Sequence, residues 1–309
     1  MSRVRVAVFA PSPILTVTIE PNHGDSPEIH LHAGGQGFWV ARMAASLGAH
    51  VVLCCALGGE SGRVLEPLLQ AQGATEVRAV RTQAENGAYV HDRRSGERVI
   101  VAETHGESLA RHEVDELYGM IVTAALDCDV TLVTGTQNAA VVDPEIYHRL
   151  TRDLRKNGRR ALADLSCEQL TAALAGGVEL VKVNDDEAVS TGFAAGHSRA
   201  ELVSALDDIR RAGADNALIT RGSEPALALA GDELIELSGP SFEPMEPRGA
   251  GDSMFAALGV ALAEQRPLKE ALRMAAAAGA LNATRHGLGS GTQPEVVRLA
   301  GHVTVRDVA

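Results

Sequence analysis

The chain has 309 residues and a formal net charge of −12 at pH 7, from 28 lysine and arginine and 40 aspartate and glutamate side chains. This acidic balance excludes a general nucleic-acid-binding protein, which needs a basic face, so we expect no nucleic-acid partner. One tryptophan, three tyrosines and five phenylalanines are also too few for a platform that stacks single-stranded bases.

The cysteines and the apolar runs indicate a cytoplasmic protein with no membrane partner. No C-x-x-C pair is present, and isolated cysteines are typical of free thiols in a reducing compartment. The four cysteines are Cys54, Cys55, Cys128 and Cys167. No run of residues approaches the 18 uncharged apolar positions that a transmembrane helix needs.

Short apolar runs alternate with amphipathic segments along most of the chain. The predicted strands are residues 4–9, 51–55, 129–133, 160–163, 179–182 and 216–220. The predicted helices between them are residues 37–48, 61–72, 111–126, 143–157 and 198–212. Strand and helix alternation at this spacing is typical of parallel βαβ units. We therefore expect an α/β fold with one doubly wound, mostly parallel sheet flanked by helices.

Two stretches, residues 14–33 and 86–104, instead alternate apolar and polar residues around central turns. This pattern is typical of half-exposed antiparallel strands, so they predict a small β-sheet lid beside the α/β body. The last third is rich in alanine and predicts helices at 253–264, 268–283 and 293–300, then a strand at 302–305. We expect residues 1–309 to form a single domain.

The strongest chemical signal is the run Arg248-Gly249-Ala250-Gly251-Asp252-Ser253, which opens an apolar helix. A glycine-rich turn at a helix start presents free backbone N–H groups and the positive end of the helix dipole to an anion. Asp252 is placed to take a proton from a hydroxyl that attacks a phosphoryl group. The alternative interpretation is that Asp252 only caps the helix and the glycines only form a turn.

Other glycine turns and polar strand ends follow the same logic. The residues concerned are Gly34, Gly35 and Gln36 before a helix, Asn184 and Glu187 after a strand, Thr220 and Gly222 at a strand end, and Asn282, Gly287 and Gly289 near the C-terminus. Glycine turns permit a ligand close to the backbone, and a carboxylate with an amide can hold water around Mg²⁺. Each has a plainer interpretation as a turn or as an acidic helix start.

In combination these motifs resemble the PfkB-type carbohydrate kinases of the ribokinase-like superfamily, and among them the 1-phosphofructokinase and tagatose-6-phosphate kinase branch. Gly34-Gly35-x-Gly37 resembles the first signature of that branch, and Gly249-Ala250-Gly251-Asp252 resembles the second. Lys182-x-Asn184-x-x-Glu187 resembles the family motif K-P-N-x-x-E. The resemblance covers essentially the whole chain.

The resemblance implies a ribokinase-like fold and ATP-dependent phosphorylation of a sugar or sugar-phosphate hydroxyl. It implies that Asp252 is the general base and that Gly249, Ala250 and Gly251 form the anion hole. Asn184, Thr220, Gly222, Asn282, Gly287 and Gly289 would bind the nucleotide, and Glu187 would hold Mg²⁺, through water. Gly34, Gly35, Gln36, Trp39 and Arg248 would contact the acceptor.

On the acceptor side the sequence departs from the family pattern. Ile14 stands where the N-terminal strand of the family offers an aspartate, and Gln36 and Trp39 replace the lysine and asparagine of G-G-K-G-x-N. Asn86-Gly87 stands near the Thr-Arg of the family lid. Glu246-Pro247-Arg248 stands where the family has an aspartate followed by threonine or serine. The phosphate-transfer half therefore matches the family, and the acceptor half is rewritten.

Several further side chains have two interpretations. Trp39 would stack on a sugar or a flat ring, or would fill space between lid and body. Asp164 and Ser166 follow a strand and would either contact substrate or form a turn. Arg93 and Arg94 are expected to be solvated at a hairpin tip. His30 and His32 lie two apart and are expected at the lid surface rather than on a metal.

Two alternatives to the sugar kinase stay open at this stage. One is a nucleotide-binding or sugar-sensing protein that has lost catalysis. The other is a kinase for a non-phosphorylated sugar or a nucleoside. We also expect a homodimer through the lid, because exposed sheet edges tend to be covered.

Overall fold

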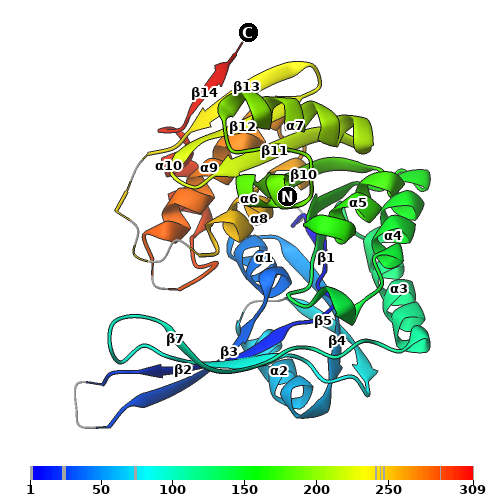
Figure 1. The fold of residues 1–309 in the computed structure, drawn as a ribbon, viewed down its shortest axis with the longest axis vertical. Helices are drawn as coiled ribbons and strands as arrows, with labels where there is room; N and C mark the ends of the chain where they lie inside the picture. The colour runs from blue at the N-terminus through cyan, green and yellow to red at the C-terminus, as the bar shows by residue number, and fades with distance from the viewer. Residues whose placement is uncertain are drawn as a thin grey trace.

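The computed structural model describes residues 3–22, 26–72, 75–240, 242–243, 245, 248–285 and 287–308. A ten-stranded sheet forms the body, in the order β14-β13-β12-β11-β10-β9-β8-β1-β4-β5 (Figure 1). The parallel strands are β1 (Arg5–Phe9), β4 (His50–Gly58), β5 (Glu76–Thr82), β8 (Val130–Thr134), β9 (Ala161–Asp164), β10 (Val178–Asn184) and β11 (Ala214–Arg221). The antiparallel strands are β12 (Glu224–Ala230), β13 (Glu233–Ser238) and β14 (Thr304–Asp307).

Helices cover both faces of this sheet, because its strands carry apolar side chains in both directions. In β1, Val6 and Val8 belong to one buried core, and Ala7 and Phe9 belong to the other. The first core includes α1 (Gln36–Ser46), α2 (Gly59–Gln72), α8 (Ala250–Ala263), α9 (Leu268–Ala283) and α10 (Gln293–Ala300). The second includes α3 (Arg111–Leu126), α4 (Glu145–Lys156), α5 (Cys167–Gly176), α6 (Asp185–Ser190) and α7 (Arg199–Ala212).

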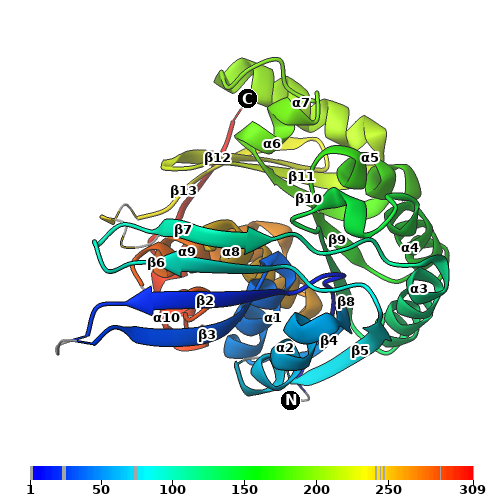
Figure 2. The same cartoon turned by 60° about the horizontal axis from the view of Figure 1, so that its bottom comes forward.

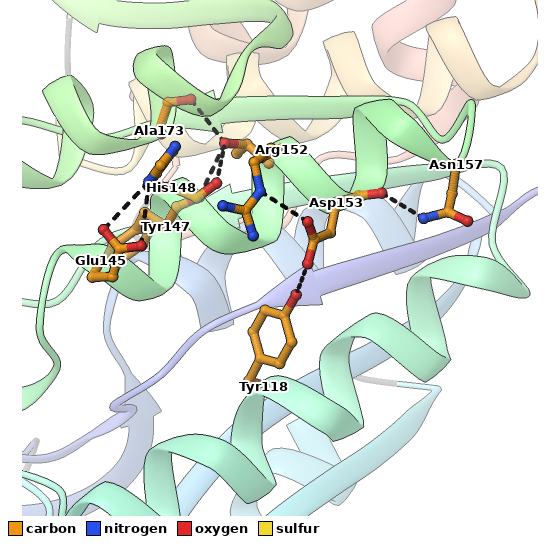
Figure 3. Close-up of polar contacts among 9 residues, drawn as sticks. Tyr118, Glu145, Tyr147, His148, Arg152, Asp153, Asn157 and Ala173 are labelled. Atoms are coloured by element: carbon orange, nitrogen blue, oxygen red, sulfur yellow. Dashed lines mark hydrogen bonds and ion pairs between the residues drawn. The ribbon is translucent and has the colours of Figure 1, made fainter.

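Polar contacts join the helices of the second layer to one another (Figure 3). The Tyr118 hydroxyl of α3 donates to Asp153 Oδ2 of α4 at 2.5 Å, and Arg152 Nε lies 3.0 Å from the other oxygen of that carboxylate. The Thr151 hydroxyl donates to the Ala173 carbonyl of α5 at 2.8 Å. These bonds join α3, α4 and α5 to one another.

A separate four-stranded sheet in the order β3-β2-β6-β7 forms the lid, seen toward the viewer in Figure 2. Its strands are β2 (Ile14–Glu20), β3 (Glu28–Gly34), β6 (Ala88–Asp92) and β7 (Val99–Thr104). Two antiparallel hairpins, β2–β3 and β6–β7, are joined by the parallel pair β2–β6. The lid predicted from residues 14–33 and 86–104 is therefore confirmed.

The predicted fold class is confirmed, and several element boundaries were wrong. The helix predicted at 253–264 begins at Ala250, because Ala250 and Gly251, which were assigned to a turn, already belong to its first turn. The strand predicted at 302–305 lies at Thr304–Asp307. Strands β5, β12 and β13 and helices α5 and α6 were not predicted. No helix in the described part of the chain is long and apolar enough to cross a bilayer.

Candidate active site

A cavity of about 630 Å³ lies between the lid and the carboxyl ends of the parallel strands. Its wall is built by the segments that follow β1, β8 and β9, by the first turns of α1 and α8, and by one face of the lid. Ligands of open α/β sheets bind at this edge, because the loops that leave parallel strands converge there. Most of the segments that the sequence predicted to carry site residues therefore contribute to the wall of this one cavity.

The first turn of α8 presents Asp252 to this cavity. Gly249 is the residue before the helix and adopts a left-handed φ of 72°, which a residue with a Cβ rarely adopts. Because the helix begins at Ala250, Asp252 is its third residue and not its cap. No side chain of the described residues makes a capping hydrogen bond at this helix start. Gly249 and Asp252 both line the cavity. The interpretation of Asp252 as a helix cap is therefore wrong.

A buried ion pair lies directly beneath this turn. Lys182 of β10 and Asp164 of β9 are register partners on neighbouring strands, and Lys182 Nζ lies 2.9 Å from Asp164 Oδ2. A Cβ built on Gly251 would lie only 2.8 Å from the same Nζ. Glycine at position 251 thus lets the helix start approach the lysine, whose charge adds to the positive end of the helix.

The carboxyl groups around Lys182 have shifted pKa values. Burial and, to a smaller extent, the charge of Asp164 raise the pKa of Asp252 to about 7, against the opposing effect of Lys182. Burial likewise raises the pKa of Asp164 to about 6 against the opposing effect of Lys182. Burial lowers the pKa of Lys182, but Asp164, Glu187 and Asp252 more than offset this and leave it above its usual value.

Asn184 and Glu187 form a reciprocal cap at the start of α6. Asn184 Oδ1 accepts from the Glu187 amide at 2.7 Å, and Glu187 Oε2 accepts from the Asn184 amide at 2.7 Å. Only Glu187 lines the cavity. Together with Asp164 and Asp252 it supplies carboxylate oxygens around one space, and this is the donor set that Mg²⁺ prefers.

The residues predicted for the nucleotide divide into two groups. Thr220 pairs with Asn184 across the ends of β11 and β10, and Gly222 forms the following turn with φ 56°. These three residues lie at the sheet edge beside the cavity, not in its wall.

The second group surrounds the start of α8. Asn282 is fully buried, donates to the Arg248 carbonyl at 2.9 Å and accepts from the Gly289 amide at 2.8 Å. Gly287 and Arg248 line the cavity. Asn282 therefore ties the late glycine loop to the turn before α8. Glu246 and Pro247 lie outside the described residues.

The glycine turn before α1 also lines the cavity. Gly35, Gln36 and Trp39 line it, and Gly34 lies behind them against Thr16. Gln36 Oε1 accepts from the Gly135 amide at 3.0 Å, so this side chain is held by the loop after β8. The Trp39 ring lines the cavity and packs, partly buried, against the core, with its centroid 5.0 Å from that of Phe38 in an edge-on arrangement.

The lid contributes side chains that sequence reasoning did not assign. The residues of the lid that line the cavity are Ile14, Thr16, Thr18, Glu20, His32, Tyr89, His91, Arg93, Arg98, Ile100 and Glu103. The expectation that Arg93 is solvated was wrong, whereas Arg94 is exposed and pairs with Asp92. The alternation of apolar and polar residues along 14–20 and 88–92 could have identified these cavity-facing side chains, because every second side chain of a strand faces the same way.

Comparison with known proteins places this α/β kinase-like site in a family. The model of the pfkB family of carbohydrate kinases matches residues 12–295, and the chain belongs to this family. It is accordingly a carbohydrate kinase, an enzyme that phosphorylates a sugar hydroxyl.

Curated relatives and a solved structure agree over nearly the whole chain. The ATP-dependent 6-phosphofructokinase isozyme 2 of Escherichia coli is 29% identical over 93% of this chain and 94% of its own length. The 1-phosphofructokinase of Escherichia coli is 26% identical over 95% of this chain and 98% of its own. A crystal structure of Escherichia coli phosphofructokinase-2 superposes with a TM-score of 0.83 at 25% identity, covering 96% of this chain and 98% of that one.

Proposed function

We propose that this kinase transfers the γ-phosphate of ATP to a hydroxyl of a sugar or sugar phosphate, with Asp252 as general base. The observation that carries the proposal is the position of Asp252 in the first turn of α8, facing the cavity. Its pKa of about 7 leaves a carboxylate that is basic enough to accept a proton near neutral pH.

The backbone around Gly249, Ala250 and Gly251 would form the anion hole for the phosphoryl group in flight. The N–H groups of a first helical turn have no partner within the helix. Lys182 lies under the same turn, close to Gly251, and adds a fixed positive charge. Positive groups held in place before the reaction stabilise charge that develops in the transition state.

The nucleotide would lie along the sheet edge from Asn184 to the late glycine loop. Thr220 and Gly222 offer a hydroxyl and an open turn at the end of β11. On the other side, Asn282 holds Gly289 and thereby shapes the loop that begins at Gly287. This path ends at the anion hole, where the γ-phosphate is needed.

Glu187 is the residue that would hold Mg²⁺, through water. One of its carboxylate oxygens is used by the cap with Asn184, which fixes the orientation of the group toward the cavity. When bound, the ion neutralises charge on the phosphates. The chain itself contributes the carboxylates of Glu187 and Asp252, whereas that of Asp164 is paired with Lys182.

Replacement of Asp252 tests the proposal. Asp252→Asn removes the base and is expected to reduce kcat by a factor of about 10²–10⁴, with little change in ATP affinity. Asp127→Asn, at the exposed end of α3, is the matched control and is expected to leave kcat unchanged. The assay measures ADP release with ATP and a panel of free sugars, nucleosides and sugar phosphates.

The panel also separates the alternatives. Turnover that depends on Asp252 excludes a silent sensor, and preference for a nucleoside would favour stacking on Trp39. Normal turnover by Asp252→Asn would contradict the assignment of the base. Absence of turnover with every acceptor, together with tight ATP binding, would favour the sensor.

We also propose a homodimer through the lid. The outer face of the lid exposes large apolar side chains, namely Ile29 (64% exposed), Leu31 (44%), Val99 (52%) and Val101 (60%). A second copy would cover this surface and the edge strand β7. Sedimentation is expected to give a dimer for the native chain and a monomer for Val99→Glu/Val101→Glu. A monomeric native chain would contradict this.

The cysteines support a cytoplasmic location for the enzyme. Cys54, Cys55 and Cys128 are buried free thiols, and Cys167 is an exposed free thiol. Free thiols persist in a reducing compartment. Fractionation of cells that express the native chain is expected to recover the enzyme with soluble cytoplasmic markers.

A further inference from the structure

Asn282 holds together two segments of the chain that belong to no helix or strand. Its Nδ2 donates to the Arg248 carbonyl at 2.9 Å, and its Oδ1 accepts from the Gly289 amide at 2.8 Å. The side chain is fully buried, and Asn282 is not among the residues that line the cavity. A ligand in the cavity therefore meets the segments that Asn282 holds and not its amide group.

The bond to Arg248 fixes the backbone just before α8. The first hydrogen bond within this helix runs from the Ser253 amide to the Gly249 carbonyl at 2.9 Å, so the Arg248 carbonyl lies one residue outside the helical series. A carbonyl that is removed from water needs a partner, and Asn282 supplies one. This bond sets the direction of the peptide group between Arg248 and Gly249.

Gly249 is held from two sides in a left-handed conformation. Its φ is 72°, and a Cβ built on it would lie 3.2 Å from Leu288 Cδ2 and 3.5 Å from Asn282 Nδ2. Because glycine populates positive and negative φ about equally, its neighbours must select the one that the turn requires. Asn282 and Leu288 are the neighbours that do so.

Helix α9 presents Asn282 on the face that packs against the start of α8. Gly279 lies three residues earlier and therefore on the same face, and both positions are buried. A Cβ built on Gly279 would lie 3.1 Å from the Ala250 carbonyl and 2.5 Å from Met254 Cγ. Two positions of α9 thus support the turn that carries Asp252.

The second bond of Asn282 fixes the late glycine loop. Gly289 has a φ of 62°, and a Cβ built on it would lie 3.0 Å from the Trp39 carbonyl of α1. The loop therefore lies between α1 and Asn282, and it carries Leu288 against Gly249. One amide group holds both the turn before α8 and the loop that packs on this turn.

We infer that Asn282 is a positioning residue of the phosphoryl-transfer site. It holds the peptide group before Gly249, and that group orients the free N–H groups of the first turn of α8 and the carboxylate of Asp252. The inference rests on the proposed function, to which the anion hole and the base belong. It replaces the direct contact with the nucleotide that the family resemblance implied for Asn282.

Kinetics of Asn282→Leu separate positioning from nucleotide contact. Leucine has the same branched shape but forms neither hydrogen bond. We expect kcat to fall about 10- to 100-fold, because a shift of about 1 Å in reacting groups has this effect, while the KM for the acceptor changes less than about threefold. The dissociation constant of ADP, which lacks the γ-phosphate, is likewise expected to change less than about threefold. A large loss of ADP affinity with native kcat would overturn the inference.

Asn216→Leu is the matched control. Asn216 makes the same two kinds of bond, because its Nδ2 donates to the Glu179 carbonyl at 3.0 Å and its Oδ1 accepts from the Gly231 amide at 3.1 Å. It lies near the beginning of β11, away from the strand ends that border the cavity. The control is expected to lose thermal stability and to keep native kcat. Equal losses of kcat in Asn216→Leu and Asn282→Leu would overturn the inference.

Hydrogen exchange provides a readout that needs no turnover. In Asn282→Leu the amides of residues 253–256, which form the first bonds of α8, are expected to exchange at least about tenfold faster, and in Asn216→Leu at the native rate. Thermal unfolding confirms that each variant is folded. Asn282→Ala is the smaller substitution, and it is expected to change exchange in the same direction.

The outcomes distinguish the positioning role from the proposed function. Faster exchange in Asn282→Leu, in a native chain that shows no turnover dependent on Asp252, would support the positioning role and contradict the kinase proposal. Native exchange and native kcat in Asn282→Leu, with turnover that depends on Asp252, would overturn the positioning role alone.

Discussion

Lys182 Nζ lies 2.9 Å from Asp164 Oδ2, and these two side chains are 5% and 1% exposed. The pair is formed by register partners on β10 and β9, so the parallel sheet itself brings the charges together. It lies beneath Gly251 and beside Asp252. The main sheet therefore sets the electrostatic environment of the proposed base.

Removal of the lysine is expected to destabilise the fold. Lys182→Met leaves Asp164 buried and unpaired, which costs about 3–5 kcal/mol of the free energy of unfolding at pH 8. The cost should shrink below pH 6, because an Asp164 without its lysine becomes protonated. Urea denaturation measures the change.

A double variant and an exposed lysine provide the controls. Lys182→Met/Asp164→Asn removes both charges and is expected to be more stable than Lys182→Met alone. Lys156→Met, at the exposed end of α4, should change stability by less than about 0.5 kcal/mol. Equal losses for the single and double variants would mean that the ion pair has no role in stability.

The activity of the native chain should depend on pH through Asp252. Its pKa of about 7 means that the carboxylate form declines as the pH falls below neutrality. We expect kcat/KM to fall about tenfold for each pH unit below 7 and to level above pH 8. A profile that stays flat down to pH 5 would exclude Asp252 as the base.

The same group should make stability depend on pH. The folded pKa of Asp252 lies above its value in the unfolded chain, so its contribution favours the fold at low pH and is lost as the pH rises toward about 7. Asp252→Asn is therefore expected to be more stable than the native chain at pH 8 and similar at pH 4. Chemical denaturation at the two pH values measures this difference.

Gly251 is expected to tolerate no side chain. In Gly251→Ala the new Cβ would lie 2.8 Å from Lys182 Nζ and would push either the helix start or the ion pair aside. We expect kcat to fall at least about tenfold, because a small displacement of the anion hole weakens stabilisation of the transition state. Gly119→Ala is the control, since nothing lies within 4 Å of the new Cβ and alanine favours a helix interior.

Asn86 is expected to hold the lid to the body through its side-chain hydrogen bonds. Its Oδ1 accepts from the Gly58 amide at 2.9 Å, and its Nδ2 donates to the Pro13 and Ala56 carbonyls at 3.1 Å each. Asn86→Leu leaves these buried groups unpaired and should cost about 2–4 kcal/mol. Asn157→Ala, at the exposed end of α4, should cost much less. Hydrogen exchange should show the added opening where the lid joins the body.

Much of the fold follows from local patterns. The alternation of apolar and polar residues predicted β2 and β6, and glycines that follow apolar segments predicted the ends of most helices. Strand β12, EPALALA, was missed because alanine carries little strand preference, and β5, EVRAVRT, because its arginines break the apolar run. The start of α8 was misplaced because two glycines resemble a turn.

The α/β alternation, the lid strands and the motif around Asp252 were predictable from the amino-acid pattern, because each is formed by residues close together in the chain. The folded chain was needed to show that Lys182 faces Asp164 and that Arg42, His91 and Arg98 line one cavity. Those residues come from different elements, and their proximity depends on strand register and on how the lid lies over the body. No local spacing encodes such distances, so the grouping of these residues around one cavity emerged only from the folded chain.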